Sequence, residues 1–336
     1  MTDATPISLP RVVALPAARR SVIVCALLAL LLAAMAAPAA RAEGLDGKDW
    51  RHALYVVADL STRPAAAPVV VLLGGSTSRE STISDGAWRA QIAGRGGPAV
   101  IAHNLSSRNQ SFAQDLHLVS RLPSTPTLVF IGVNPHRFCA SPNLQFAMDT
   151  ITFDPQPQHV YSERRVLPEA EKERIARDWI PKQYPKFDER FSYNLGMLEL
   201  VIKACLERGH RPVLLDLPRN ADVVGDRLDL PVGRYSRACL ELSARYETPF
   251  VSFVNGAGLT SRDFFDNAHL VETGRAKYQR KLSDTTVALL REYGMAVNDR
   301  PARTPANEVA DWSVSPWSDL PAFLLREEPV VALAAE

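Results

Sequence analysis

The segment Val69–Glu80, with the sequence VVVLLGGSTSRE, constrains the fold of this chain more than any other stretch. Its first five residues are apolar, which suits a central strand of a parallel sheet because helices cover such a strand on both faces. Gly74 and Gly75 permit a sharp turn after the strand, which leaves Ser76 at the carboxyl edge of the sheet. Residues 77–80 have the spacing of a capping box and predict a helical turn. Taken alone, the segment also fits an ordinary Gly-Ser turn between a strand and a helix.

Strand signals of this kind alternate with helical patterns along the chain. The predicted strands are Val69–Leu73, Ala99–Ala102, Leu128–Val133, Val213–Leu217 and Phe250–Val254. Apolar residues at helical spacing predict helices at 46–62, after Ser111, at 195–208, at 235–246 and from Glu272 to Gly294. Such alternation favours right-handed crossovers and a parallel sheet. We therefore predict one α/β domain, a doubly wound, flavodoxin-like parallel sheet of five strands with helices on both faces.

The predicted domain covers residues 43–298 and has one helical insertion after the third strand, at 138–190. The segment 163–190 is rich in Glu, Arg and Lys of mixed sign and also contains Trp179. That composition favours a solvated helical insertion, with a lid or a partner-docking surface as the functional alternative. Residues 299–336 form a Pro-rich C-terminal tail.

The first 42 residues have the layout of a secretory signal peptide. Arginines precede an uncharged apolar run at 21–40, and Ala40-Arg41-Ala42 offers a small-x-small cleavage site. The run is also near the ~20 residues that span a bilayer, so an uncleaved N-terminal anchor is the alternative. We expect a periplasmic or secreted protein or, with residues 21–40 retained as a membrane anchor, one at the inner membrane that faces outward.

Composition limits the partners and the redox chemistry of the chain. Hydrophobic residues make up 46% of it, enough for a sizeable core, and a formal net charge of +1 gives no reason to expect nucleic acid as a partner. Beyond the N-terminal segment there are three cysteines, Cys139, Cys205 and Cys239. An odd number permits one disulfide with a spare thiol or three thiols, and the apolar patterns around Cys205 and Cys239 favour burial. The chain has no phosphate-binding loop or dinucleotide fingerprint, and we expect no cofactor.

Polar residues follow every predicted strand. Because ligands bind beyond the carboxyl ends of the strands in open parallel sheets, these residues are expected to share one edge. They are Ser76 after the first strand, 103–107 after the second, 132–136 after the third, 216–220 after the fourth and 266–269 beyond the fifth.

Asp266 and His269 form the most informative pair at this edge. A D-x-x-H pair on a helical turn places both side chains on one face, within reach of each other. The aspartate can then hold one imidazole nitrogen while the other takes a proton from a hydroxyl such as that of Ser76. A metal site that adds His103 and His136 is the alternative. Their spacing matches no zinc pattern, however, and we predict no metal.

Four blocks of the sequence resemble, in order, those of the SGNH (GDSL-type) hydrolase superfamily. They are GGST around Ser76, NLSSRNQS from Asn104, GVN ending at Asn134 and DNAHLVETGRAKY from Asp266. They span residues 69–290, and the last block is the most specific. The whole is similar to exported members of the superfamily that are associated with acyl modification of cell-surface polysaccharide.

The resemblance implies a role for each block. Ser76 would attack an ester carbonyl, His269 would act as the general base, and Asp266 would orient the imidazole. The oxyanion would be held by the N–H of the serine, by a backbone N–H of the second block, here at Ser106, and by the side chain of Asn134. Two blocks depart from the family pattern. The first reads GGS where GDS is usual, and Ser106 stands where a glycine is expected, so that a side chain crowds the approach.

The expected function is that of an exported serine esterase that cleaves an O-acyl ester, foremost an acetyl ester, through an acyl-enzyme on Ser76. An O-acyltransferase that acts on a cell-surface polysaccharide would use the same residues and differ in how well its acceptor site excludes water. A catalytically silent binding or assembly protein of the same fold is the non-enzymatic alternative. The expected ligand is an acylated small molecule or carbohydrate, with Arg219 as a candidate contact.

Overall fold

The computed structural model describes residues 45–62, 67–141 and 165–295. The predicted signal segment and C-terminal tail lie outside these ranges, as do residues 142–164 of the predicted insertion. Among the described helices, none combines the length and the apolar character that crossing a membrane requires.

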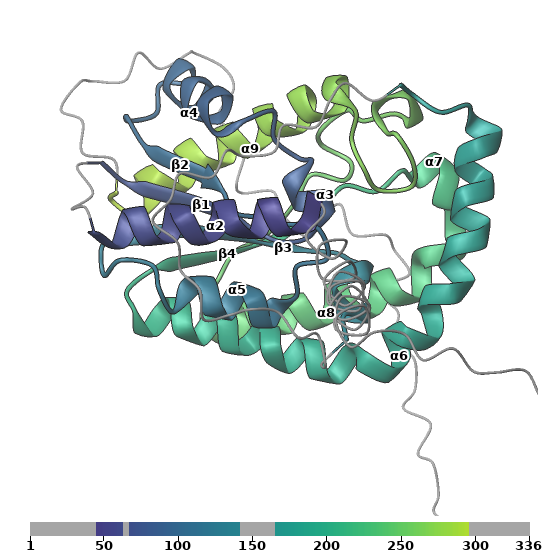
Figure 1. Ribbon diagram of the computed structural model, residues 1–336, viewed down its shortest axis with the longest axis horizontal. Coiled ribbons are helices and arrows are strands. Elements are labelled where there is room, and N and C mark those ends of the chain that lie inside the picture. The colour runs from purple at the N-terminus through teal and green to yellow at the C-terminus, as the bar shows by residue number, and fades with distance from the viewer. Residues whose placement is uncertain (1–44, 63–66, 142–164, 296–336) are drawn as a thin grey trace, which may run out of the picture. The chain divides into compact units, whose positions relative to one another are not determined.

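Five parallel strands form one sheet in the described chain (Figure 1). They are β1 (Val69–Leu73), β2 (Ile101–Asn104), β3 (Thr127–Val133), β4 (Arg211–Asp216) and β5 (Phe250–Ser252). Their order is β2-β1-β3-β4-β5, and every neighbouring pair is parallel. This confirms the predicted doubly wound, flavodoxin-like sheet. The second strand begins at Ile101 rather than at Ala99.

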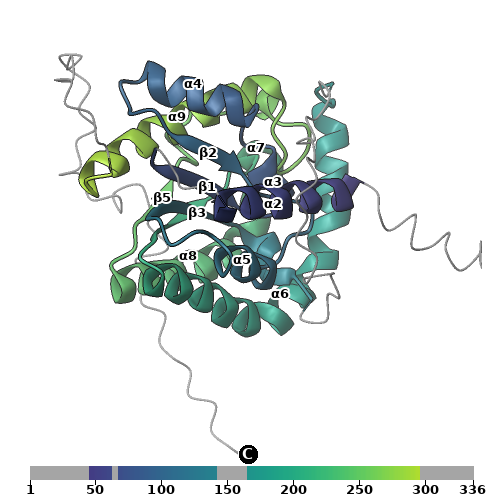
Figure 2. The ribbon, with the colours of Figure 1, turned by 60° about the vertical axis from the view of Figure 1, so that its left-hand side comes forward.

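Helices cover both faces of the sheet (Figures 1 and 2). One face packs against α4 (Asp85–Gly94) and α9 (Glu272–Glu292). The other packs against α2 (Leu45–Thr62), α5 (Phe112–Val119), α6 (Glu169–Glu207) and α8 (Asp229–Tyr246). The shorter elements are α3 (Ser76–Arg79), α7 (Ala221–Val224) and the 3-10 turns η1 (Pro135–Cys139), η2 (Gly225–Leu228) and η3 (Ser261–Asp263).

Strand β1 is apolar at every position because both of its faces are covered by helices. Val69, Val71 and Leu73 belong to the core beneath α2 and α5, whereas Val70 and Leu72 belong to the core beneath α4 and α9. All five side chains are fully buried. Each contributes roughly 1.5–3 kcal/mol by leaving water, so both faces of the strand must be apolar.

The order of the strands also determines where a ligand can bind. Strand β2 lies on one side of β1, and β3, β4 and β5 follow one another on the other side. In open α/β sheets, ligands bind beyond the carboxyl ends of the strands at such a reversal of strand order. The segments leaving the two strands at this point begin with Gly74 after β1 and Asn134 after β3. The fold therefore places the turn of Ser76 at the position where binding is expected.

Helix α6 differs from the solvated insertion predicted from its charged sequence. It runs as one continuous helix over Glu169–Glu207, where a helical insertion and a separate helix at 195–208 were predicted. One face of its first half is buried: Lys172 and Ala176 are fully covered, and Phe187 is almost so. The other face exposes charges such as Arg174, which pairs with acidic neighbours on the same helix. Apart from Lys172, the mixed charges that suggested solvation therefore lie mainly on the exposed side of an amphipathic helix.

The three cysteines Cys139, Cys205 and Cys239 are buried and unpaired with one another. This confirms the burial that the sequence favoured for Cys205 and Cys239. Burial also raises the pKa of Cys139 to about 11, so its thiol stays protonated at neutral pH and is a weak nucleophile.

Candidate active site

Ser76, His269 and Asp266 form a hydrogen-bonded chain at the carboxyl edge of the sheet. The Nε2 of His269 lies 2.9 Å from the Oγ of Ser76, and its Nδ1 lies 2.8 Å from the Oδ2 of Asp266. The histidine is 24% exposed and the aspartate 13%, and the serine is half-buried. The structure thus brings together three residues that the sequence separates by up to 193 positions, in an order that permits proton transfer and leaves the serine accessible.

Asp266 and His269 lie on a bend rather than on the predicted helical turn. An antiparallel bridge between Phe264 and Leu270 closes this bend. The Oδ1 of Asp266 accepts the N–H groups of Ala268 and His269, both at 2.9 Å. An aspartate that accepts backbone N–H groups two and three residues ahead stabilises such a bend. The spacing D-x-x-H therefore brings the two side chains together by a different local geometry.

The electrostatics of Asp266 suit an ionised partner for the imidazole. Burial alone would raise the pKa of this carboxyl group. The hydrogen bond and the charge of His269, together with the two backbone N–H groups, outweigh burial and hold the pKa of Asp266 below its usual value. The group is therefore a carboxylate at neutral pH.

Side chains from α6 and from the segment after β4 support the bend and the η3 turn before it. The ammonium group of Lys172 donates to the carbonyl of Ser261 at 2.6 Å. The side chain of Asn220 donates to the hydroxyl of Ser261 at 3.0 Å and to the carbonyl of Asp266 at 3.2 Å. Asn220 thus holds the bend directly, and Lys172 holds η3, the turn that leads into it.

The turn that carries Ser76 depends on Gly74, whose φ is +152°. A Cβ atom at Gly74 would lie 2.0 Å from the Oγ of Ser78 and 2.7 Å from its Cβ, so only glycine fits. Helix α3 then begins at Ser76, with Gly75 as its N-cap and no side-chain capping bond. The predicted helical turn is present, but the predicted capping box is not, because the helix starts before Thr77.

Asn134 lies beside this turn, as the sequence predicted. It is the N-cap residue of η1, and its Oδ1 accepts the N–H of Arg137 at 3.1 Å. Its Nδ2 donates to the hydroxyl of Thr77, the residue after Ser76, at 3.3 Å. The capping bond therefore orients the amide so that its donor end faces the serine turn.

Ser106 is engaged differently from the prediction. Its N–H donates to the Oδ1 of Asn104 at 3.1 Å, and its hydroxyl donates to the carbonyl of Leu72 at 3.3 Å. Both donors of Ser106 are therefore already used in hydrogen bonds within the protein. Asn109 in the same loop is exposed and has a φ of +58°, a left-handed conformation that asparagine tolerates better than most residues. Among the described hydrogen bonds, none uses the N–H of Asn109.

Arg219 lies in an internal network near the carboxyl end of β4. Its Nη1 lies 3.4 Å from Asp216 and donates to the hydroxyl of Tyr235 at 3.2 Å. Burial alone would lower the pKa of Arg219, but the nearby Asp216 and Tyr235 keep it above its usual value. The side chain is only 19% exposed, so its contacts are those of a structural ion pair.

His103 and His136, the two histidines considered as metal ligands, each contact another side chain. His103 pairs with Asp85 at 2.8 Å. In the described ranges, no group of three His, Cys, Asp or Glu side chains is arranged to hold a metal ion. His136 instead stacks on Trp179 of α6, with ring centroids 3.7 Å apart.

His136 and Trp179 form a stacked pair near the candidate site. The sequence analysis did not predict this pair. Burial, followed by the charge of His269, lowers the pKa of His136 to about 3, although Asp266 opposes this shift. His136 is therefore neutral at neutral pH. The signal that could have revealed the stacked pair is the position of Trp179 on the same helical face as Ala176 and Lys172.

Comparisons with known proteins found similarity only at the level of structure. No family model matches the chain, and no curated protein matches its sequence. One similar solved structure is that of TesA, with 14% identity and a TM-score of 0.41, covering 66% of this chain and 99% of that one. Another is a GDSL-like lipase from Bacteroides thetaiotaomicron, with 10% identity and a TM-score of 0.40, covering 71% and 98%. A third is a putative acylhydrolase from Bacteroides fragilis, with 11% identity and a TM-score of 0.39, covering 69% and 94%. The solved structures that this chain is similar to thus include a GDSL-like lipase.

Proposed function

We propose that this protein is a serine esterase of the SGNH type that hydrolyses an O-acyl ester, foremost an acetyl ester. The observation that carries the proposal is the hydrogen-bonded chain from Ser76 through His269 to Asp266. The ionised state of Asp266 and the exposure of His269 support it. Export to the periplasm or beyond is part of the proposal and depends on the sequence layout of residues 1–42.

In the acylation step, the Oγ of Ser76 attacks the ester carbonyl carbon while the Nε2 of His269 takes the hydroxyl proton. Asp266 holds the Nδ1–H of the imidazole, which keeps Nε2 free as the acceptor and stabilises the imidazolium that forms. His269 then gives the proton to the departing alcohol as the carbon–oxygen bond of the ester breaks. Water, deprotonated by the same Nε2, then attacks the acyl carbon. The bond between this carbon and the Oγ of Ser76 breaks, His269 returns the proton to Oγ, and the carboxylic acid leaves.

The negative charge on the tetrahedral oxygen requires hydrogen-bond donors beside Ser76. The Nδ2 of Asn134 is one, because its present acceptor is the hydroxyl of the adjacent Thr77. The N–H of Ser76 is the second. For the donor from the loop after β2 we assign the N–H of Asn109 in place of that of Ser106, whose N–H already serves Asn104.

A fluorophosphonate probe tests the proposal directly, because it phosphonylates a serine that a neighbouring base has activated. We expect the wild-type protein to be labelled in a 1:1 ratio, with the modification on Ser76 by mass spectrometry. The Ser76→Ala variant should show no labelling. Ser106→Ala is the matched control, since this serine is buried with its hydroxyl bonded to Leu72, and it should be labelled like the wild type. If correctly folded wild-type protein is not labelled, the alternative of a silent binding or assembly protein replaces the esterase.

Hydrolysis and acyl transfer can be separated by the fate of the acyl group. With p-nitrophenyl acetate as the donor, we expect acetate release to exceed transfer to an added oligosaccharide, because Ser76 and His269 are both accessible to solvent. Quantifying acetate and acetylated oligosaccharide in the same reaction measures the ratio. Transfer that exceeds hydrolysis at millimolar acceptor would assign the chain to the O-acyltransferases instead.

A further inference from the structure

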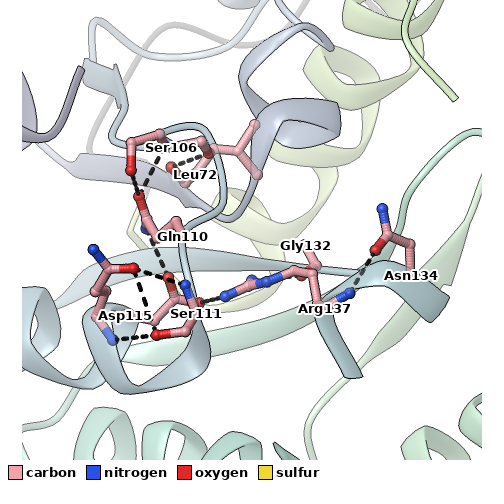
Figure 3. Close-up of polar contacts among 10 residues, drawn as sticks. Leu72, Ser106, Gln110, Ser111, Asp115, Gly132, Asn134 and Arg137 are labelled. Atoms are coloured by element: carbon pink, nitrogen blue, oxygen red, sulfur yellow. Dashed lines mark hydrogen bonds and ion pairs between the residues drawn. The ribbon is translucent and has the colours of Figure 1, made fainter. Parts of the chain in front are cut away.

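A buried ion pair between Arg137 and Asp115 (Figure 3) lies next to Gly74, which precedes the turn of Ser76. The side chain of Arg137, in η1, is 3% exposed and that of Asp115, in α5, is fully buried. The Nη2 of Arg137 donates to the Oδ2 of Asp115 at 2.7 Å, and its Nη1 donates to the carbonyl of Gly132 at 2.7 Å. The guanidinium carbon also lies 4.0 Å from the centroid of the Phe112 ring. The proposed reaction transfers no proton to or from this pair.

From the ion pair, the network reaches the loop 107–110. The Oδ1 of Asp115 accepts from the Nε2 of Gln110 at 2.7 Å. The Oε1 of Gln110 accepts from the N–H and the hydroxyl of Ser107, at 2.8 and 2.9 Å. The N–H of Ser107 also donates to the carbonyl of Gly74 at 3.1 Å. The loop is thereby tied both to the ion pair and to the turn before the serine.

In the other direction the network reaches Asn134. The backbone N–H of Arg137 donates to the Oδ1 of Asn134 at 3.1 Å (Figure 3). The same residue thus fixes the orientation of the amide through its backbone and holds Asp115 through its side chain. The two elements that supply the proposed oxyanion donors, the loop after β2 and the turn after β3, are joined by one continuous set of contacts.

Stability alone gives little reason to keep a charged pair at this position. Removing two charges from water costs several kcal/mol, and a buried pair replaced by apolar groups of similar size is often no less stable. A planar guanidinium with two donors fixed in direction does, however, set the distance and the angle between the groups it joins. In a site where charge develops on one oxygen atom, donors must be in place before the reaction.

The geometry points to Arg137 as a positioning residue that acts through Asn134. Held in place by Asp115 and Gln110, Arg137 fixes the amide of Asn134 beside the turn of Ser76. This inference rests on the proposed esterase function. Donors that bind the oxyanion act mainly in the transition state, and a displacement of about 1 Å costs on the order of 10²-fold in rate. Loss of the network should therefore lower kcat and leave KM nearly unchanged.

The test is a double-mutant cycle on the esterase reaction of the full-length protein. The pair variant Arg137→Met/Asp115→Asn removes both charges together, because removing one alone would leave a buried charge without its partner. We expect it to lower kcat by about 10- to 10²-fold with KM within about twofold of the wild type. In an Asn134→Ala background, the same pair should lower kcat by less than about threefold, since the group it positions is gone.

Equal losses in both backgrounds, an unchanged kcat, or a rise in KM at unchanged kcat would overturn the inference. The matched control is Arg95→Met/Asp284→Asn, which makes the same substitutions in a partly exposed pair at 3.1 Å between the C-cap residue of α4 and α9, and it should change neither constant. If circular dichroism shows that the pair variant is unfolded, Arg137→Lys decides the question in the same two backgrounds. Lysine lacks the planar guanidinium with two donors fixed in direction. We therefore expect kcat to fall about 10-fold when Asn134 is present and not to fall in the Asn134→Ala background. An active wild type with no such pattern refutes only this inference, whereas an inactive and unlabelled wild type refutes the proposed function.

Discussion

Replacing His269 by alanine is expected to lower kcat/KM for p-nitrophenyl acetate by at least about 10³-fold. The imidazole is placed to take the serine proton, with its Nε2 2.9 Å from the Oγ of Ser76, and no other base lies at hydrogen-bond distance from that oxygen in the described chain. Initial rates over a range of substrate concentrations measure the effect. Ser76→Ala should bring the rate to a similarly low level, since the two residues act as one unit.

The chain supplies a closely matched control for this experiment. His103 pairs with Asp85 at 2.8 Å, and the two side chains are 21% and 11% exposed, which are nearly the values of His269 and Asp266. The His103→Ala variant should therefore suffer similar losses of packing and charge, yet retain kcat/KM within about threefold of the wild type. Comparable losses in the two histidine variants would show that the effect is structural and would contradict the assignment of His269 as the base.

The Gly74→Ala variant is expected to lose about 3–5 kcal/mol of unfolding free energy, from overpacking and from backbone strain together. The added methyl group would lie 2.7 Å from the Cβ of Ser78, and that atom can move only with the helix α3 backbone. The φ of +152° at this position adds strain for any residue with a side chain. Urea denaturation followed by circular dichroism measures the loss.

Gly75→Ala provides the comparison for stability. Its backbone has a φ of −81°, and the nearest atom to an added Cβ is the carbonyl oxygen of Gln110, at 4.0 Å. This variant should stay within about 1 kcal/mol of the wild type. If both glycine variants unfold at the same urea concentration as the wild type, the turn before Ser76 is not the tight structure described here.

The sheet could be predicted from the sequence because its strands are buried on both faces. An apolar run such as Val69–Leu73 has few alternatives once helical patterns flank it. Polar residues directly after such strands indicate the functional edge, since that edge is common to all parallel strands. Ser76, Asn134 and the pair of Asp266 and His269 were placed at this edge by that reasoning, and the structure brings them together.

Other features depended on contacts that no local pattern contains. Ser106 was chosen by its place in a block, but a side chain two residues away, that of Asn104, already accepts its N–H. Asp115 and Arg137 lie 22 positions apart and look like surface charges when each is considered alone. The buried face of α6 was hidden by the many charges on its other face. Long-range pairing of this kind is visible only once the fold is known.

Helix α6 contains two prolines, Pro181 and Pro185, within its length. Proline has no N–H to donate, so each removes one backbone hydrogen bond from the helix and makes it easier to bend at that point. The prolines lie between Lys172, which is bonded to Ser261 in η3 just before the bend of the candidate base, and the second half of the helix, which packs on the sheet. We therefore expect bending to concentrate beside Trp179. Bending there would move Trp179, and with it the imidazole of His136 on which it stacks, relative to the sheet.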